Sequence, residues 1–192
     1  MSLHRRHALH VIAAIAAASF GPRVVRAQSP AVSRTTAYAF SFKDLNGGDL
    51  RLAHHAGKPI LIVNTASLCG YARQFSGLET LWTRYRERGL LVVGVPSNDF
   101  GGQEPGGADD IQRAATAHGV TFPLMAKVDV KGETAHPFYR WAALQRPLET
   151  PRWNFHKYLV GREGLIAGAY ASAVEPQDPR VVSAIESELK TA

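Results

Sequence analysis

The sequence predicts an α/β domain with a mixed central sheet and helices on both faces. Two short runs, 59–66 and 90–95, are apolar throughout and rich in branched side chains, which is typical of central strands covered on both faces. An amphipathic stretch over 74–88 lies between them and predicts a helical crossover, so the two strands are expected to be parallel. Two later strand patterns around a turn at 161–164 predict an antiparallel hairpin.

The other elements follow from local patterns along the chain. Small and aromatic residues alternate over 37–42, and turn residues at 46–48 separate them from a similar short run at 50–52, which predicts two short strands. The further predictions are a glycine-rich loop over 96–107, a helix over 108–118, a short strand over 124–130, a helix over 137–144, hairpin strands over 155–160 and 165–170, and a helix over 181–189. This order is that of a thioredoxin-like fold, predicted to occupy residues 37–190.

Charge is concentrated at the start of the chain. The 192 residues carry a formal net charge of +6, but four arginines and no acidic residue lie in the first 27 positions, which leaves 18 basic and 16 acidic residues beyond them. Those basic residues form no run with interleaved aromatic side chains, so no nucleic-acid partner is expected.

Residues 1–27 have the three parts of an export signal. A basic start that contains Arg5-Arg6 precedes an apolar run over 11–20 and a small-residue cleavage site that ends at Ala27. The apolar run is too short to span a bilayer, so no stable membrane insertion is expected; an uncleaved signal anchor is the alternative. Paired arginines also resemble a twin-arginine signal, although they occur in ordinary export signals as well. We therefore expect a periplasmic or secreted protein, with 28–36 as a flexible lead-in.

The chain has a single cysteine, Cys69, and so cannot form an internal disulfide. Cys69 comes just after the predicted strand 59–66 and before the predicted helix 74–88. Backbone N–H groups and the positive end of a helix dipole at such a place favour the thiolate, which is the nucleophilic form of the side chain. A buried, inert cysteine is the alternative. A loop position next to Gly70 favours chemistry instead.

Four segments, in order along the chain, form a set of motifs around this cysteine. They read LIVNTASLCG at 61–70, PSNDFGGQEPG at 96–106, GVTFPL at 119–124 with KVDVKG at 127–132, and WNFHKYLV at 153–160. Together they resemble the glutathione peroxidase family over nearly the whole chain after the leader. The resemblance implies a thioredoxin-like fold and a thiol peroxidase. It also implies four site residues, namely the nucleophile Cys69 with the side chains of Gln103, Trp153 and Asn154.

Neutral donors suit this chemistry. An amide or an indole N–H stabilises a thiolate and a developing oxyanion without protonating the sulfur. Taken alone, a tryptophan in an apolar stretch indicates a core position, and a glutamine in a glycine-rich loop indicates solvent exposure. Only their combination with Cys69 favours a catalytic role.

The chain departs from the family in one respect that decides the expected reductant. Many cysteine-type members keep a second cysteine on the helix after the glycine-rich loop, whereas residues 111–117 here read IQRAATA. A sulfenic acid at Cys69 must then be resolved by an external thiol, either glutathione or a thioredoxin-like protein. The connection between Trp141 and Trp153 is also shorter than in tetrameric members. This implies a monomer with an open active-site face that accepts hydrogen peroxide and organic hydroperoxides.

Other functions remain as alternatives. Oxidised Cys69 could pass its oxidation to a partner protein, as in a peroxide sensor or relay. A catalytically inactive binding module is disfavoured by the three retained donors, and a disulfide oxidoreductase is disfavoured because Cys69 lacks a C-x-x-C partner. No metal or other cofactor is expected, since His54-His55 has no further ligand pattern and the glycines form no nucleotide fingerprint. Lys127, Arg73 and Arg152 are candidates for steering an anionic thiol, although a solvated charge is the plainer interpretation of each.

Overall fold

The computed structural model describes residues 35–190 of the chain. The predicted export signal at 1–27 and most of the predicted lead-in at 28–36 lie outside these residues. In chain order the elements are β1 (Ser41–Lys43), β2 (Asp49–Arg51), β3 (Ile60–Thr65), α1 (Gln74–Tyr85), β4 (Leu91–Pro96), α2 (Ala108–Ala117), α3 (Pro137–Gln145), β5 (Lys157–Val160), β6 (Ile166–Tyr170) and α4 (Pro179–Leu189), with short 3-10 helices η1 (Ala37–Ala39), η2 (Leu52–His55) and η3 (Arg86–Arg88).

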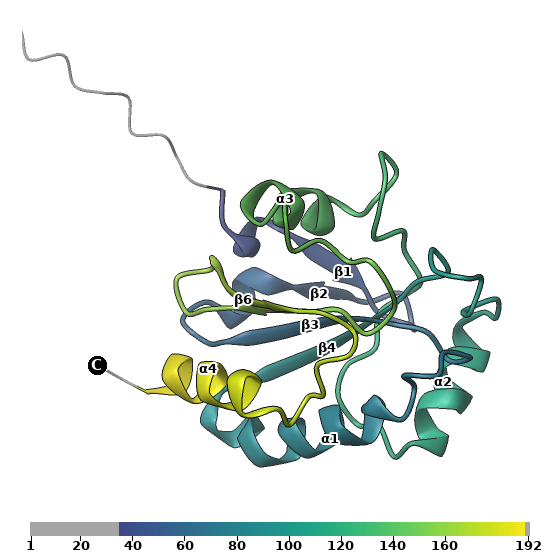
Figure 1. Cartoon of the computed structure of the whole chain (residues 1–192), viewed down its shortest axis with the longest axis horizontal. Helices are drawn as coiled ribbons and strands as arrows, with labels where there is room; N and C mark the ends of the chain where they lie inside the picture. Colours follow the sequence, from purple (N-terminus) through teal and green to yellow (C-terminus); the bar gives the residue numbers. More distant parts are fainter. Residues whose placement is uncertain (1–34, 191–192) are drawn as a thin grey trace, which may run out of the picture. The chain divides into compact units, whose positions relative to one another are not determined.

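A four-stranded mixed sheet in the order β4-β3-β5-β6 forms the centre of the domain (Figure 1). β3 and β4 are parallel and all their residues are buried. β5 runs antiparallel to β3, and β6 runs antiparallel to β5. The predicted mixed sheet, its parallel pair and its hairpin are confirmed.

Helices cover both faces of this sheet, because alternate residues of each strand point to opposite sides. Ile60 and Ile62 pack with α3 and the β1–β2 hairpin, whereas Leu61 and Val63 pack with α1, α2 and α4. In Figure 1, α1 and α4 lie along one side of the sheet, and α3 and the hairpin lie along the other. The apolar runs that predicted the strands are therefore buried from both sides.

The predicted strand over 37–42 is wrong in its first half. Residues 37–39 form the 3-10 helix η1, in which Phe40 N–H donates to the carbonyl of Ala37 at 3.1 Å. The N–H of Ala37 itself bonds the carbonyl of Gly164 at 2.8 Å. This segment satisfies its hydrogen bonds locally and against the β5–β6 turn, so only β1 remains to pair with β2.

The predicted strand over 124–130 is also wrong. Only Leu124 and Met125 make isolated bridges, to Gly94 and Asp44. Further on, the N–H of Val130 donates to the side chain of Asp99 at 2.6 Å instead of to a neighbouring strand. Other N–H groups of the segment go to the carbonyls of Gly94, Lys43 and Pro96. No single neighbouring strand therefore pairs with it, and the sequence pattern does not reveal these scattered partners.

Candidate active site

Three separate stretches of chain meet at one edge of the sheet. The loops after β3 and β4 leave from the carboxyl ends of two parallel strands, and such ends lie at the same edge. Because β5 is antiparallel to β3, the stretch that leads into β5 arrives at this edge as well. These three stretches carry Cys69, Gln103 and the Trp153-Asn154 pair, respectively. The strand directions alone thus bring the four predicted site residues to one region.

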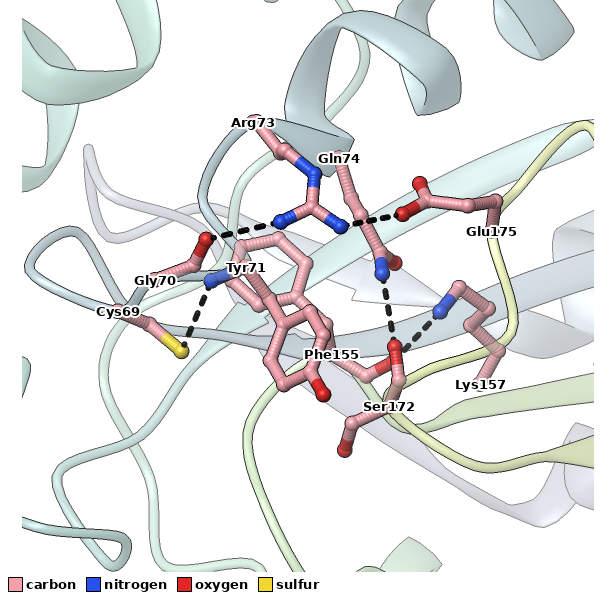
Figure 2. A network of polar contacts seen from close by, with 9 residues as sticks. All are labelled: Cys69, Gly70, Tyr71, Arg73, Gln74, Phe155, Lys157, Ser172 and Glu175. Carbon is pink, nitrogen blue, oxygen red and sulfur yellow. Dashed lines mark hydrogen bonds and ion pairs between the residues drawn. The ribbon is translucent and has the colours of Figure 1, made fainter.

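Cys69 lies in the turn that connects β3 to α1 and is 5% exposed. Its sulfur accepts a hydrogen bond from the backbone N–H of Tyr71 at 3.4 Å, as Figure 2 shows. Its own N–H and carbonyl bond Ala66 and Ala72 at 3.3 and 2.8 Å. The turn is therefore held by its own backbone, and α1 begins only at Gln74.

The cysteine turn is tied to the glycine-rich loop through the backbone and through one buried carboxylate. Leu68 N–H donates to the carbonyl of Gln103 at 3.0 Å. The carboxylate of Glu104, 1% exposed, accepts from the N–H and the hydroxyl of Ser67 at 2.9 and 3.0 Å. Burial raises the pKa of Glu104, and the two bonds from Ser67 oppose that rise. Sequence reasoning missed Glu104; its place next to Gln103 was the only available signal.

The Trp153-Asn154 pair is held against β3 by Asn64. The side-chain amide of Asn64 donates to the carbonyl of Trp153 at 3.2 Å, and the N–H of Phe155 donates to the carbonyl of Asn64 at 2.6 Å. Asn154 is fully buried, whereas Trp153 is 40% exposed. The indole is thus the member of the pair that solvent and substrate can reach.

Gln103 and Asn154 contact each other directly. The Asn154 Nδ2 group donates to Gln103 Oε1 at 3.0 Å and to the carbonyl of Phe100 at 3.3 Å. Since the oxygen of Gln103 is turned toward Asn154, its NH₂ group stays available as a donor. A Cβ atom placed on Gly101 would lie 3.4 Å from Trp153 Cη2 and 3.5 Å from Gln103 Cγ. The side chains of Gln103 and Trp153 therefore converge over this glycine.

The sulfur of Cys69 makes no direct contact of this kind with the side chains of Gln103, Trp153 and Asn154. Within residues 35–190, no hydrogen bond joins the Cys69 sulfur to the side chains of Gln103, Trp153 or Asn154. The structure brings the three donors together and ties the Cys69 turn to them through Leu68 and Ser67. A groove of about 440 Å³, lined by Ser67, Leu68 and Glu104 among others, opens beside this turn. Leu68 at its rim is 68% exposed.

Two of the cations considered for steering a thiol are already engaged. The Lys127 ammonium donates to the carbonyls of Glu104 and Gly106 at 3.0 and 2.9 Å, so it holds the glycine-rich loop. The exposed Arg73 pairs with Glu175 at 2.8 Å.

In the part of the chain that the structure describes, no cluster of three or more potential ligands is placed to hold a metal ion. In this same part, no helix has the length and apolar character needed to cross a membrane.

His156 makes the fold sensitive to acid. Burial, together with the neighbouring Lys157 ammonium, lowers the pKa of His156 from 6.5 to about 4. Between these values the unfolded chain binds a proton that the folded chain does not, so the free energy of unfolding should fall by about 3 kcal/mol as the pH drops from 7 to 4. Denaturant titrations of the wild type and of His156→Gln at both pH values will measure this. The variant should lose most of this difference, and the exposed-site control His54→Gln should keep it. An equal drop in His156→Gln would contradict the assignment.

A thioredoxin-like fold with one thiol at this sheet edge, next to amide and indole donors, is the arrangement of a thiol peroxidase. Residues 37–143 match the family model for glutathione peroxidase. The chain is 41% identical over 158 residues to "Hydroperoxy fatty acid reductase gpx1" of Synechocystis sp., covering 77% of this chain and 94% of that relative. It is 40% identical over 144 residues to "Glutathione peroxidase-like peroxiredoxin gpx1" of Schizosaccharomyces pombe, covering 73% and 91%. The chain belongs to the glutathione peroxidase family.

Solved structures agree with this assignment. T. cruzi GPX1 has a TM-score of 0.66 and 28% sequence identity, over 81% of this chain and 97% of that one. A thioredoxin-family thiol:disulfide interchange protein from Chlorobium tepidum has a TM-score of 0.60 at 16% identity, over 79% of this chain and 93% of that chain, which shows the shared fold alone. The predicted thioredoxin-like fold and the predicted family are confirmed.

Proposed function

We propose that this thiol peroxidase is exported and reduces hydrogen peroxide and organic hydroperoxides through a sulfenic acid at Cys69. The observation that carries the proposal is the convergence of Gln103, Trp153 and Asn154 at the sheet edge where the Cys69 turn is tied down. Export rests on the leader pattern of residues 1–27. It would place the enzyme in the periplasm or outside the cell, by either the twin-arginine or the ordinary export route.

The proposed catalytic cycle has three steps. The Cys69 thiolate attacks the terminal oxygen of ROOH, so an S–O bond forms and the O–O bond breaks. The leaving RO⁻ takes up the proton that the thiol released and departs as ROH. A thiol R′SH then condenses with the sulfenic acid to a mixed disulfide and water, and a second R′SH releases R′SSR′ and restores Cys69. In the first step the Gln103 NH₂ and the Trp153 indole N–H would donate to the leaving oxygen, where negative charge develops.

An external reductant is proposed because Cys69 is the one cysteine of the chain. Glutathione and a thioredoxin-like protein are both suitable.

A bulky peroxide substrate is supported by the exposed Leu68 and Trp153 and by the groove beside the cysteine turn. The name of the Synechocystis relative, a hydroperoxy fatty acid reductase, points the same way. We propose a monomer whose open face admits such substrates; a strong preference for hydrogen peroxide over a phospholipid hydroperoxide would count against this.

Mass spectrometry of the protein after one equivalent of peroxide tests the function. We expect one added oxygen on Cys69, conversion to a mixed disulfide when glutathione is added, and neither product in Cys69→Ser. The same spectra give the processed N-terminus. Steady turnover with glutathione supports the peroxidase, whereas turnover only with a protein thiol would favour a relay that passes oxidation to a partner. Oxygen added at Met125 instead of at Cys69 would refute the proposal.

A further inference from the structure

Lys157 is a buried cation for which the proposed cycle has no use. It is the first residue of β5 and is 0% exposed, and no other lysine or arginine between residues 35 and 190 is buried. Its ammonium donates to the carbonyl of Phe155 at 2.7 Å. No other acceptor for this ammonium is present within residues 35–190. A buried charge with one acceptor is unfavourable for stability, so stability does not explain why Lys157 is there.

The carbonyl that Lys157 holds belongs to an unusual backbone position. Phe155 has φ +62°, which makes it the one residue other than glycine in the left-handed region among residues 35–190. This conformation is strained for a side chain with a Cβ atom, so the surroundings must impose it. On its amino side the N–H of Phe155 is held by Asn64, and on its carboxyl side the carbonyl is held by Lys157.

The left-handed turn at Phe155 separates β5 from the residues that carry the chemistry. Immediately before it come Trp153 and Asn154, and Asn154 in turn orients the amide of Gln103. Figure 2 shows Lys157 pointing toward the carbonyl of Phe155, and Gln74 pointing toward the carbonyl of Ser172 close by. A change at the Phe155 carbonyl would therefore shift Asn154 and, through it, the donor group of Gln103.

We propose that Lys157 is a positioning residue of the peroxidase. Its ammonium fixes the Phe155 turn and so sets the position of Asn154, whose amide orients Gln103 and thereby the N–H groups of Gln103. This inference rests on the proposed roles of these two amides. Lys157 touches neither the peroxide nor the sulfur in this scheme, and acts only through the backbone.

The hydrogen bond from Lys157 to the carbonyl of Phe155 should weaken when Lys157 loses its proton, because a neutral amine is a weaker donor. Burial lowers the pKa of Lys157 from 10.5 to about 8, and the Glu175 carboxylate opposes this. The other titratable and charged groups that face it are His156, Tyr170, Arg73 and Glu175. His156 is already neutral, since its pKa is about 4; burial raises the pKa of Tyr170, the cross-strand neighbour; and Arg73 is paired with Glu175.

Activity and stability should therefore change in opposite directions above pH 8. Between pH 8 and 10.5 the unfolded chain keeps a proton on Lys157 that the folded chain has lost, so this group makes the folded state more stable as the pH rises. Over the same interval kcat/KM for hydrogen peroxide should fall. A residue with a purely structural role would move both quantities together.

The experiment compares wild type, Lys157→Met and the exposed-site control Lys58→Met. For Lys157→Met we expect kcat/KM to drop about 10- to 100-fold. Its thermal midpoint should equal or exceed that of the wild type, and the alkaline fall in activity should disappear. Lys58→Met should behave as wild type. Unchanged activity in Lys157→Met, or a loss of activity together with a lower thermal midpoint, would overturn the proposal.

Two measurements on the wild-type protein complete the test. If Lys157→Met does not fold, the wild type alone must still show the alkaline fall in activity near pH 8, and its absence overturns the proposal. An inactive wild type, or one that gains no oxygen at Cys69, would refute the proposed function itself. An active wild type with an insensitive Lys157→Met would refute only the role of Lys157.

Discussion

Replacing Cys69 by serine is expected to lower kcat/KM for hydrogen peroxide by roughly 10⁴-fold or more, because a serine hydroxyl is not ionised near neutral pH and cannot be oxidised to a sulfenic acid. Peroxide consumption in the presence of excess glutathione measures the loss. Serine differs from cysteine by a single atom, so the free energy of unfolding should stay within about 1 kcal/mol of the wild type.

A thiol titration is the control for the Cys69→Ser variant. Cys69 is the one thiol, so titration with a thiol reagent should fall from one group per chain to none, and circular dichroism should remain that of the wild type. Substantial peroxidase activity in Cys69→Ser would place the oxidised atom elsewhere and would remove the basis of the proposed cycle.

Replacing Gln103 by methionine is expected to lower kcat/KM for peroxide by about 10²- to 10³-fold, the usual effect of removing one donor to a developing oxyanion. Methionine has nearly the same length as glutamine but no N–H group, so the substitution removes the donors and largely keeps the packing over Gly101. It also removes the acceptor of the Asn154 amide. Initial rates at several peroxide concentrations will show whether the loss is in kcat/KM.

Gln112→Met is the matched control, because Gln112 lies on α2 and is exposed. The same chemical change there should leave the kinetics unchanged. A loss of less than threefold in Gln103→Met would mean that the amide has no part in stabilising the leaving oxygen.

The central strands could be predicted because nothing competes with their pattern. β3 and β4 are buried on both faces, and a short apolar run with no helical period has few other places in an α/β domain. The segment 37–39 was mispredicted because it turns back on itself in a 3-10 helix and bonds Gly164. The segment 124–130 was mispredicted because its N–H groups bond several separate stretches of chain, including the side chain of Asp99. Partners scattered over distant parts of the chain leave no local signal.

Some residues of the site could likewise be predicted from the sequence, and others could not. Cys69 could be selected from its position after a buried strand, but Gln103, Trp153 and Asn154 were selected by resemblance to a family. Glu104 and Lys157 could not be identified as buried at all, because charged residues are exposed by default. Their burial depends on the Ser67 groups and the Phe155 carbonyl, which the chain supplies only after folding.

The antiparallel course of β5 has a consequence for how the enzyme comes into being. During synthesis the thiol emerges well before the indole and the second amide, which belong to the last third of the chain. The stretch that carries them docks only when β5 pairs with β3. Under the proposed roles, a nascent molecule lacks the indole and amide donors until that late step. Efficient reaction with peroxide would therefore begin only when the sheet closes.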